Sequence, residues 1–189
     1  MKKQAITAVI KLPLFSGYEV LKMILREFRE SDAEKIISWL RNEREFRLWC
    51  ADRYDHFPIL PEDMIMKYSE CGKTGTFFPM TAVSEQGEPI GHLILRYTDD
   101  MHETVRFGFV IVEPSLRGTG KGREMLRLAI DHAAKVMNAK KLSLGVFDNN
   151  RAAFNCYKAA GFNEINSSEG VFEIFGEKWK CIEMGMNVI

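Results

Sequence analysis

A glycine-rich stretch between a β-prone run and an amphipathic run constrains the fold of this chain more than any other feature. The run "VRFGFVIV" at 105–112 is followed by "EPSLRGTGKG" and then by apolar residues at helical spacing. This order predicts a strand, a tight glycine turn and a helix in direct succession. Glycines let an anion approach the backbone closely, and free N–H groups at a helix N-terminus point toward it. The stretch therefore also predicts a phosphate site.

Two common phosphate loops are excluded position by position. A Walker A loop requires G-x-x-x-x-G-K-[ST], but Ser115 stands at its first glycine and Gly122 at its hydroxyl position. A dinucleotide-binding G-x-G-x-x-G loop fails because Arg123 replaces its third glycine. The pattern that fits is R-x-x-G-x-G, which begins at Arg117. Taken alone, a glycine-rich turn with solvated basic residues is an equal alternative.

The segments around this turn predict mixed α/β structure, because strand-like runs alternate with segments of helical periodicity. We expect strands at 23–28, 77–83, 90–97, 105–112 and 141–147, with a closing hairpin in 171–189. We expect a first helix after a capping box at Ser31–Glu34, and one or two short helices between 41 and 68. Two further helices are expected after the glycine turn and at 149–160, where Gly161 closes the second.

The chain is long enough for one sizeable core, and no repeat or linker divides residues 23–189. We therefore expect a single domain over that range. Residues 1–22 begin like a signal peptide, but Lys11 interrupts the apolar run and no transmembrane-length run follows. We expect an N-terminal extension of uncertain structure there, with secretion as the minor alternative.

The charge balance and the cysteines exclude several classes of function. The chain has 26 Lys and Arg against 26 Asp and Glu, so no overall positive field favours nucleic acid or an anionic membrane. The four cysteines form no C-x-x-C pair and no cluster with the histidines, so we expect no metal site. Free thiols indicate a reducing compartment, and we expect a cytoplasmic protein. The sequence leaves the oligomeric state open, a homodimer included.

A second motif follows the glycine turn. The stretch "NNRAAFNCYKAAGF" matches N-x-x-A-x-x-x-Y-x-x-x-G-F through Asn150, Ala153, Tyr157, Gly161 and Phe162. Together with R-x-x-G-x-G, in this order and separated by a helix and a strand, it resembles the GCN5-related N-acetyltransferase (GNAT) family. The resemblance covers the chain from residue 23 and is strongest at 107–162. The opening "LREFRESDAEKIISWL" is similar to the branch that includes ribosomal-protein N-terminal acetyltransferases.

The resemblance implies a fold and a cosubstrate. It implies a single GNAT-like domain with a central, mostly antiparallel sheet flanked by helices, whose fourth and fifth strands splay apart. It implies acetyl-CoA as cosubstrate and no metal. The pantetheine arm is expected to contact Asn150 and to pair with the backbone of Val110, Ile111 and Val112. The backbone N–H near Ile111 is expected to stabilise the oxyanion that develops on the thioester. The pyrophosphate is expected on the loop formed by Arg117, Gly118, Thr119, Gly120, Lys121 and Gly122.

The resemblance also implies a reaction, the direct transfer of an acetyl group to an amine of a small molecule or protein. Tyr157 is the expected general acid, because a phenol of pKa about 10 stays protonated at neutral pH and can protonate the departing thiolate. No general base is assigned. Glu103 or Glu113 could act through water, and His92 or His102 could carry protons, but solvated or structural roles are favoured for all four.

The acceptor site is expected after the first helix and at the closing hairpin. Aromatic and acidic residues there could bind a cationic amine, although core packing and a solvated surface are the favoured interpretation for Trp49, Asp52, Tyr54, Asp55 and Phe57. The expected partners are therefore acetyl-CoA and an amine, without nucleic acid or membrane. The alternatives are a non-catalytic acyl-CoA-binding or sensor module and an enzyme that transfers a longer acyl group.

Overall fold

The computed structural model describes residues 23–165 and 170–188, so the predicted extension at 1–22 lies outside the described residues. The strands are β1 (Ile24–Glu27), β2 (Phe77–Val83), β3 (Pro89–Tyr97), β4 (Thr104–Val112), β5 (Lys141–Phe147), β6 (Asn163–Glu164), β7 (Gly170–Ile174) and β8 (Glu177–Asn187). The helices are α1 (Ala33–Ile37), α2 (Glu43–Cys50), α3 (Pro61–Gly72), α4 (Lys121–Lys135) and α5 (Arg151–Ala160), with short 3-10 turns at Glu30–Asp32 and Pro114–Leu116.

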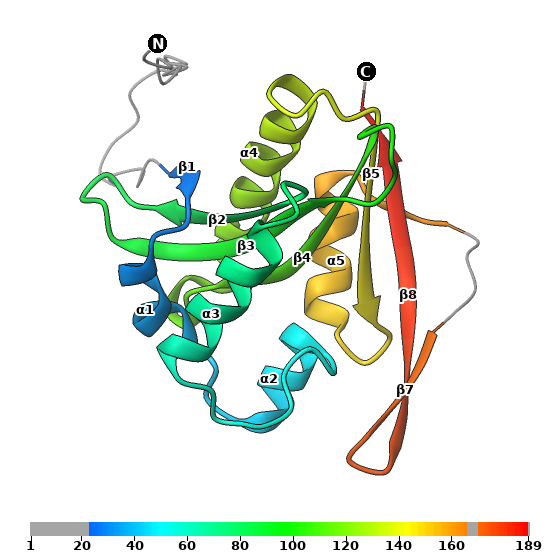
Figure 1. Cartoon of the computed structure of the whole chain (residues 1–189). Helices are drawn as coiled ribbons and strands as arrows, with labels where there is room; N and C mark the ends of the chain where they lie inside the picture. The colour runs from blue at the N-terminus through cyan, green and yellow to red at the C-terminus, as the bar shows by residue number, and fades with distance from the viewer. Residues whose placement is uncertain (1–22, 166–169, 189) are drawn as a thin grey trace, which may run out of the picture.

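The strands form one sheet in the order β1-β2-β3-β4-β5-β8-β6, with β7 paired to β8 (Figure 1). All neighbouring strands run antiparallel except β4 and β5, which are parallel. A parallel pair needs a crossover connection, and α4 supplies it. The predicted fold class, a mostly antiparallel sheet flanked by helices, is confirmed.

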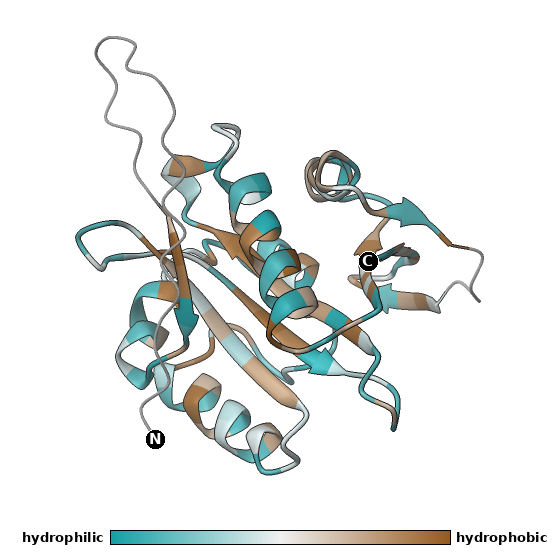
Figure 2. Cartoon of the chain, turned by 90° about the horizontal axis from the view of Figure 1, so that it is seen from above, coloured by the Kyte–Doolittle hydropathy of each residue, from teal (hydrophilic) through white to brown (hydrophobic). Residues whose placement is uncertain are grey.

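Each face of the sheet carries its own hydrophobic core, and Figure 2 shows the brown apolar colour concentrated in the strands between the helices. On one face, the buried side of α4 packs on β4 and β5, through residues that include Met125, Leu126, Ala129, Phe107 and Leu144. On the other face, α1, α2 and α3 pack over Ile94 and Ile111. The two cores leave the β4–β5 junction accessible from both the α4–α5 side and the α2 side.

The first helix begins differently from the sequence prediction. The expected capping box at Ser31–Glu34 is wrong, since the reciprocal bond is made by Asp32, whose carboxylate accepts from the backbone N–H of Arg29 at 2.9 Å. Asp32 is 3% exposed and accepts two further hydrogen bonds from Arg26, at 2.7 and 2.8 Å, and one from the Thr81 hydroxyl. This carboxylate therefore joins α1 to β1 and β2.

Asp32→Asn should lower the free energy of unfolding by about 3 kcal/mol, because removing one charge of a buried pair leaves the other uncompensated. Burial by itself raises the pKa of Asp32, but the hydrogen bonds from Arg26, Arg29 and Thr81 lower it overall. The Asp32 contribution is therefore present above about pH 4 and is lost as the pH falls through the depressed pKa. Urea unfolding across pH measures both effects.

The matched control for this substitution is Asp131→Asn. Asp131 also pairs with a cation, Lys135 at 3.3 Å, but both side chains are more than half exposed. Its removal should change the free energy of unfolding by less than about 1 kcal/mol. Equal effects of the two substitutions at neutral pH would contradict a structural role for the Asp32 cluster.

No helix within residues 23–165 or 170–188 is long and apolar enough to cross a membrane.

Candidate active site

The candidate site lies where β4 and β5 separate. Their parallel pairing runs from Thr104 opposite Lys141 to Phe107 opposite Leu144 and then stops. Beyond this point β5 continues beside β8 as far as Phe147. The space that opens between the strands is a cavity of about 730 Å³, bordered by β4, the glycine turn, α5 and α2. The predicted splaying of the fourth and fifth strands is thus present.

A bulge in β4 shapes this cavity. Between the pairs His92–Ile111 and Ile94–Gly108, β3 has one residue where β4 has two. Phe109 in the bulge has φ of +50°, a left-handed conformation that is uncommon for a non-glycine residue. Val110, Ile111 and Val112 follow and line the cavity, with no parallel partner on β5. The side of β4 that faces away from β3 has no strand partner here, although the Val112 carbonyl accepts from the Arg117 guanidinium.

The glycine turn closes one end of the cavity. Gly118 and Gly120 have φ of +78° and +89°, and a Cβ built on either would meet nothing within 4 Å. Glycine is therefore required by the backbone conformation, while the space beside it stays open. Gly120 also precedes the first turn of α4, and its N–H and that of Gly122 have no hydrogen-bond acceptor among the described residues. These donors suit an anionic ligand.

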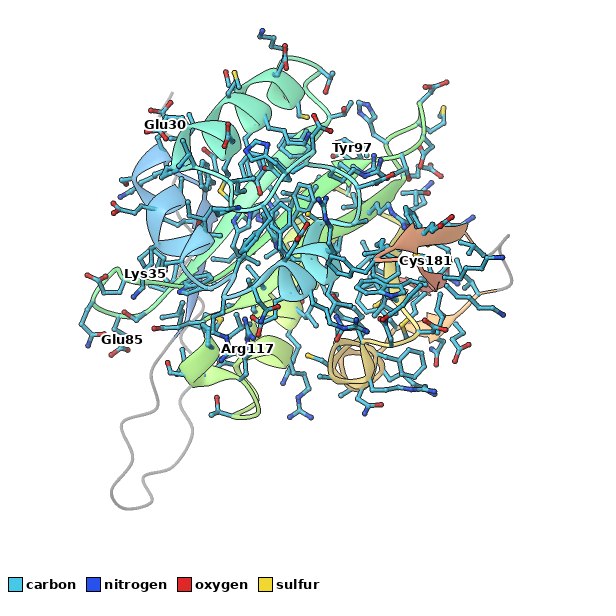
Figure 3. All side chains as sticks on the ribbon, turned by 90° about the horizontal axis from the view of Figure 1, so that it is seen from below. Glu30, Lys35, Glu85, Tyr97, Arg117 and Cys181 are labelled. Carbon is cyan, nitrogen blue, oxygen red and sulfur yellow. The ribbon has the colours of Figure 1, made fainter. Side chains whose placement is uncertain are left out.

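The three cations near the turn, Arg117, Lys121 and Arg123, differ in their partners and in whether they line the cavity. The Arg117 guanidinium donates to the carbonyls of Val112 and Trp39, at 3.2 and 3.4 Å, and pairs with Glu45 at 3.4 Å, so it ties the turn to the α2 side (Figure 3). Lys121 pairs with Glu124 at 2.8 Å. Arg123 lines the cavity without an ion pair among the described residues.

Of the predicted pyrophosphate residues, Thr119 and Lys121 belong to the turn but do not line the cavity. The Thr119 hydroxyl instead donates to the carbonyl of Leu116 at 2.7 Å. Arg117, Gly118, Gly120 and Gly122 do border the cavity, and their predicted contact with a pyrophosphate stays a prediction. The donors that the turn presents to the cavity are therefore chiefly backbone N–H groups.

Helix α5 forms the opposite wall. The Asn150 side chain caps this helix by accepting from the backbone N–H of Ala153 at 3.2 Å, which leaves its amide N–H₂ for a ligand. Tyr157 lies nearly two turns further along, lines the cavity and is 7% exposed. Its hydroxyl forms no hydrogen bond with the described residues. Asn150 and Tyr157 thus face the same space as the glycine turn.

The ionisable groups on α5 favour a neutral acid over a thiolate nucleophile. Burial, and to a lesser degree the neighbouring Cys156, raises the pKa of Tyr157, so its phenol keeps its proton at neutral pH. Burial also raises the pKa of Cys156, although Arg123 opposes this. A thiol with a raised pKa is a poor nucleophile, so the geometry gives Cys156 no nucleophilic role.

None of the four residues considered as proton carriers lines the cavity. Glu103 pairs with Lys140, and Glu113 pairs with Lys35 at 3.7 Å. His92 is fully buried, bonds the Tyr68 hydroxyl at 2.8 Å, and has its pKa lowered by burial to about 3. His102 stacks on Tyr97 outside the cavity.

In the segment predicted to form the acceptor site, the aromatic residues are in the core and the acidic residues are on the surface, which is the interpretation that the sequence favoured. Trp49 and Tyr54 are 9% and 7% exposed and stack on each other, whereas Asp52 and Asp55 are exposed. Trp49 nevertheless borders the cavity and contacts the bulge residue Phe109, at 4.9 Å between ring centroids. Trp49 therefore belongs both to the core and to the candidate site.

Several cavity residues were missed from the sequence, among them Ala152, Asn155 and Ala159 of α5. Their spacing of three or four residues places them on the face that carries Tyr157, so helical periodicity could have identified them. Leu40, Glu45 and Leu48 reach the cavity from the α2 side through tertiary packing. No short-range sequence signal marks that packing.

Within the described part of the chain, no three His, Cys, Asp or Glu side chains come together as a metal site requires. The arrangement that remains is a sheet that opens after one parallel strand pair, with unpaired backbone donors at one end and a buried phenol on the opposite wall. This is the architecture of an acyl-CoA-dependent acyltransferase.

The sequence profile of the Acetyltransferase (GNAT) family matches residues 33–162, and the chain belongs to this family. It is 26% identical over 160 residues to the spermidine N(1)-acetyltransferase of Escherichia coli, covering 85% of this chain and 83% of the relative. It is 24% identical over 168 residues to the thialysine N-epsilon-acetyltransferase of Bos taurus, covering 84% and 90% of the two chains.

Among solved structures, the spermidine N-acetyltransferase of Vibrio cholerae, determined in complex with CoA and spermine, superposes with a TM-score of 0.74. The alignment covers 87% of this chain and 95% of that one at 21% identity. The protein is thus an N-acetyltransferase that uses acetyl-CoA as cosubstrate and an amine as acceptor.

Proposed function

We propose that this enzyme transfers the acetyl group of acetyl-CoA directly to a primary amine of a small molecule. Two of its relatives are named for spermidine and thialysine, both small amines, which supports this acceptor class over a protein. The observation that carries the catalytic part is Tyr157, a buried phenol with a raised pKa and an unbonded hydroxyl in the cavity.

The cofactor is proposed to lie across the β4–β5 opening. The pantetheine arm runs along the backbone of Val110–Val112, and the amide of Asn150 contacts it from α5. The pyrophosphate lies on the N–H groups of Gly120 and Gly122, and Arg123 adds a cation at the same end of the cavity. The N–H near Ile111 is proposed to stabilise the developing oxyanion.

The reaction needs no covalent enzyme intermediate. The amine nitrogen attacks the thioester carbon, and a C–N bond forms as the C–S bond breaks. The leaving thiolate takes the phenolic proton of Tyr157, and the amine proton passes through water in the cavity, which re-protonates the phenol. No base side chain is assigned, because the carboxylates considered for this role pair outside the cavity.

The test is thiol release from acetyl-CoA with a panel of primary amines. We expect release that depends on both the protein and a small amine, with a rate that rises with pH as the amine loses its proton. If the protein binds CoA and releases thiol with peptide N-termini but with no small amine, the proposal of a small-molecule acceptor is contradicted. Binding without release for either class would favour the sensor alternative.

A further inference from the structure

Two arginines face each other on the acceptor side of the sheet. Arg96 of β3 and Arg106 of β4 are directly opposite in the antiparallel register, so their side chains leave the same face. Like charges in this position destabilise a sheet. Folding alone gives no reason for the pair, which suggests that one of the two charges serves a ligand.

Arg106 has its own counter-charge. Its guanidinium forms two parallel hydrogen bonds with the Glu183 carboxylate of β8, at 2.6 and 2.5 Å, and so passes over β5. Gly145 of β5 makes this possible, because a Cβ there would lie 2.8 Å from Nη2 of Arg106 and 2.7 Å from Sγ of Cys181. Gly145 also borders the cofactor cavity. The Arg106–Glu183 pair therefore lies at the wall of the active site.

Arg96 has no such counter-charge. Its guanidinium forms no hydrogen bond or ion pair with the described residues, while the Glu183 carboxylate is already engaged by Arg106. The Arg96 side chain is exposed, and partial burial of its guanidinium together with the positive charges of Arg106 and Arg53 lowers its pKa. Arg96 borders a second hollow of about 470 Å³. The carboxylates of that hollow do not neutralise it: Asp99 accepts from the N–H groups of Glu103 and Thr104 instead.

The distance from the reaction centre to Arg96 determines how long a ligand must be to contact both. Arg106, its neighbour, is three residues before the bulge residue Phe109, a distance of roughly 10 Å along a strand. Arg96 does not itself line the cofactor cavity, so an acceptor whose amine lies at the bulge would have to extend past Arg106 to reach it.

We infer that Arg96 is a specificity-determining residue that binds a carboxylate on the acceptor, several bonds away from the amine that is acetylated. The inference rests on the proposed function and narrows its acceptor to amino acids in which amine and carboxylate are well separated. The guanidinium offers a planar, two-pronged donor that matches a carboxylate. A polyamine would instead meet an uncompensated positive charge.

The first test compares matched acceptors by thiol release: ω-aminohexanoate and ω-aminooctanoate against hexylamine and octylamine. We expect kcat/KM for the aminocarboxylates to exceed that for the alkylamines about ten- to one-hundredfold. Arg96→Gln should abolish this preference through KM, with kcat and CoA affinity retained, and Arg96→Glu should favour diamines. Arg127→Gln, an exposed arginine of α4, is the matched control and should keep the preference. The inference would be overturned if the wild-type enzyme used aminocarboxylates and alkylamines equally well, or if its preference for aminocarboxylates survived Arg96→Gln.

The second test does not need turnover. Calorimetry of the CoA-loaded protein with ω-acetamidohexanoate, the acetylated form of one acceptor, should show saturable binding that Arg96→Gln weakens at least tenfold. If this acid binds through Arg96 but no amine releases thiol, the proposed function fails and the carboxylate site stands. If amines release thiol without regard to a carboxylate and the acid does not bind, the carboxylate site fails and the proposed function stands.

Discussion

Tyr157→Phe should lower kcat by about 10²- to 10⁴-fold while leaving the dissociation constant of CoA within about twofold, since a general acid acts on the leaving group and contributes in this range. The phenylalanine keeps the ring that packs against Phe162 and removes only the hydroxyl. Stopped-flow or steady-state thiol release measures kcat, and calorimetry measures CoA binding. Equal losses in both would indicate a packing role for the tyrosine.

The pH profile provides the second readout for the same residue. Because burial raises the pKa of Tyr157, the wild-type phenol stays protonated to higher pH than a free tyrosine, and kcat should not decline up to about pH 10. The acid limb should follow deprotonation of the acceptor amine. An alkaline decline below pH 9 that Tyr157→Phe abolishes would contradict the raised pKa. A wild-type and a Phe variant with the same kcat would remove Tyr157 from catalysis.

Gly120→Leu should weaken CoA binding by about 100-fold or more. The side chain would occupy the open space beside the α4 N-terminus and would block the backbone N–H groups proposed to hold the pyrophosphate. Two lost hydrogen bonds to a charged group, at about 1.5–3 kcal/mol each, account for this magnitude. Calorimetry with CoA measures it, and dephosphorylated pantetheine, which lacks the pyrophosphate, should bind both proteins about equally.

Gly87→Leu is the matched control for backbone strain. Gly87 has φ of +86°, close to the +89° of Gly120, and likewise has nothing within 4 Å of a built Cβ. It lies in the turn between β2 and β3, away from the cavity. Both variants should lose similar stability, but only Gly120→Leu should lose CoA affinity. Unchanged affinity in a folded Gly120→Leu protein would contradict the assignment of the loop.

The sequence allowed the strands, the later helices and the order of the two motifs to be predicted, because these depend on periodicity and on local glycine chemistry. Gly161, for example, ends α5 with φ of +108°, as a C′ glycine should. The start of the first helix was predicted wrongly, because the capping acid is chosen by tertiary contacts. Asp32 is held by Arg26 and by Thr81, 49 residues away, and these partners decide its role over Ser31.

On the acceptor side, too, local features could be predicted from the sequence and long-range contacts could not. Arg106 lies in a strand that the sequence predicts, but its partner Glu183 is 77 residues away. Only the register of β4, β5 and β8 shows that Gly145 makes room for the pair. The predicted cofactor residues follow from a contiguous motif, whereas the proposed acceptor contact depends on strands that are distant in sequence.

The interrupted pairing of β4 and β5 has a consequence for how the protein assembles. Strands β1–β4 form by sequential antiparallel pairing, whereas β5 joins them only after the α4 crossover, through four residue pairs. Long-range parallel pairing of this kind forms slowly. The residues proposed to hold acetyl-CoA belong to both half-sheets, Val110–Val112 on one side and Asn150 and Tyr157 on the other. Acetyl-CoA bound in the proposed way would contact both parts of the sheet, and by mass action it would stabilise their association.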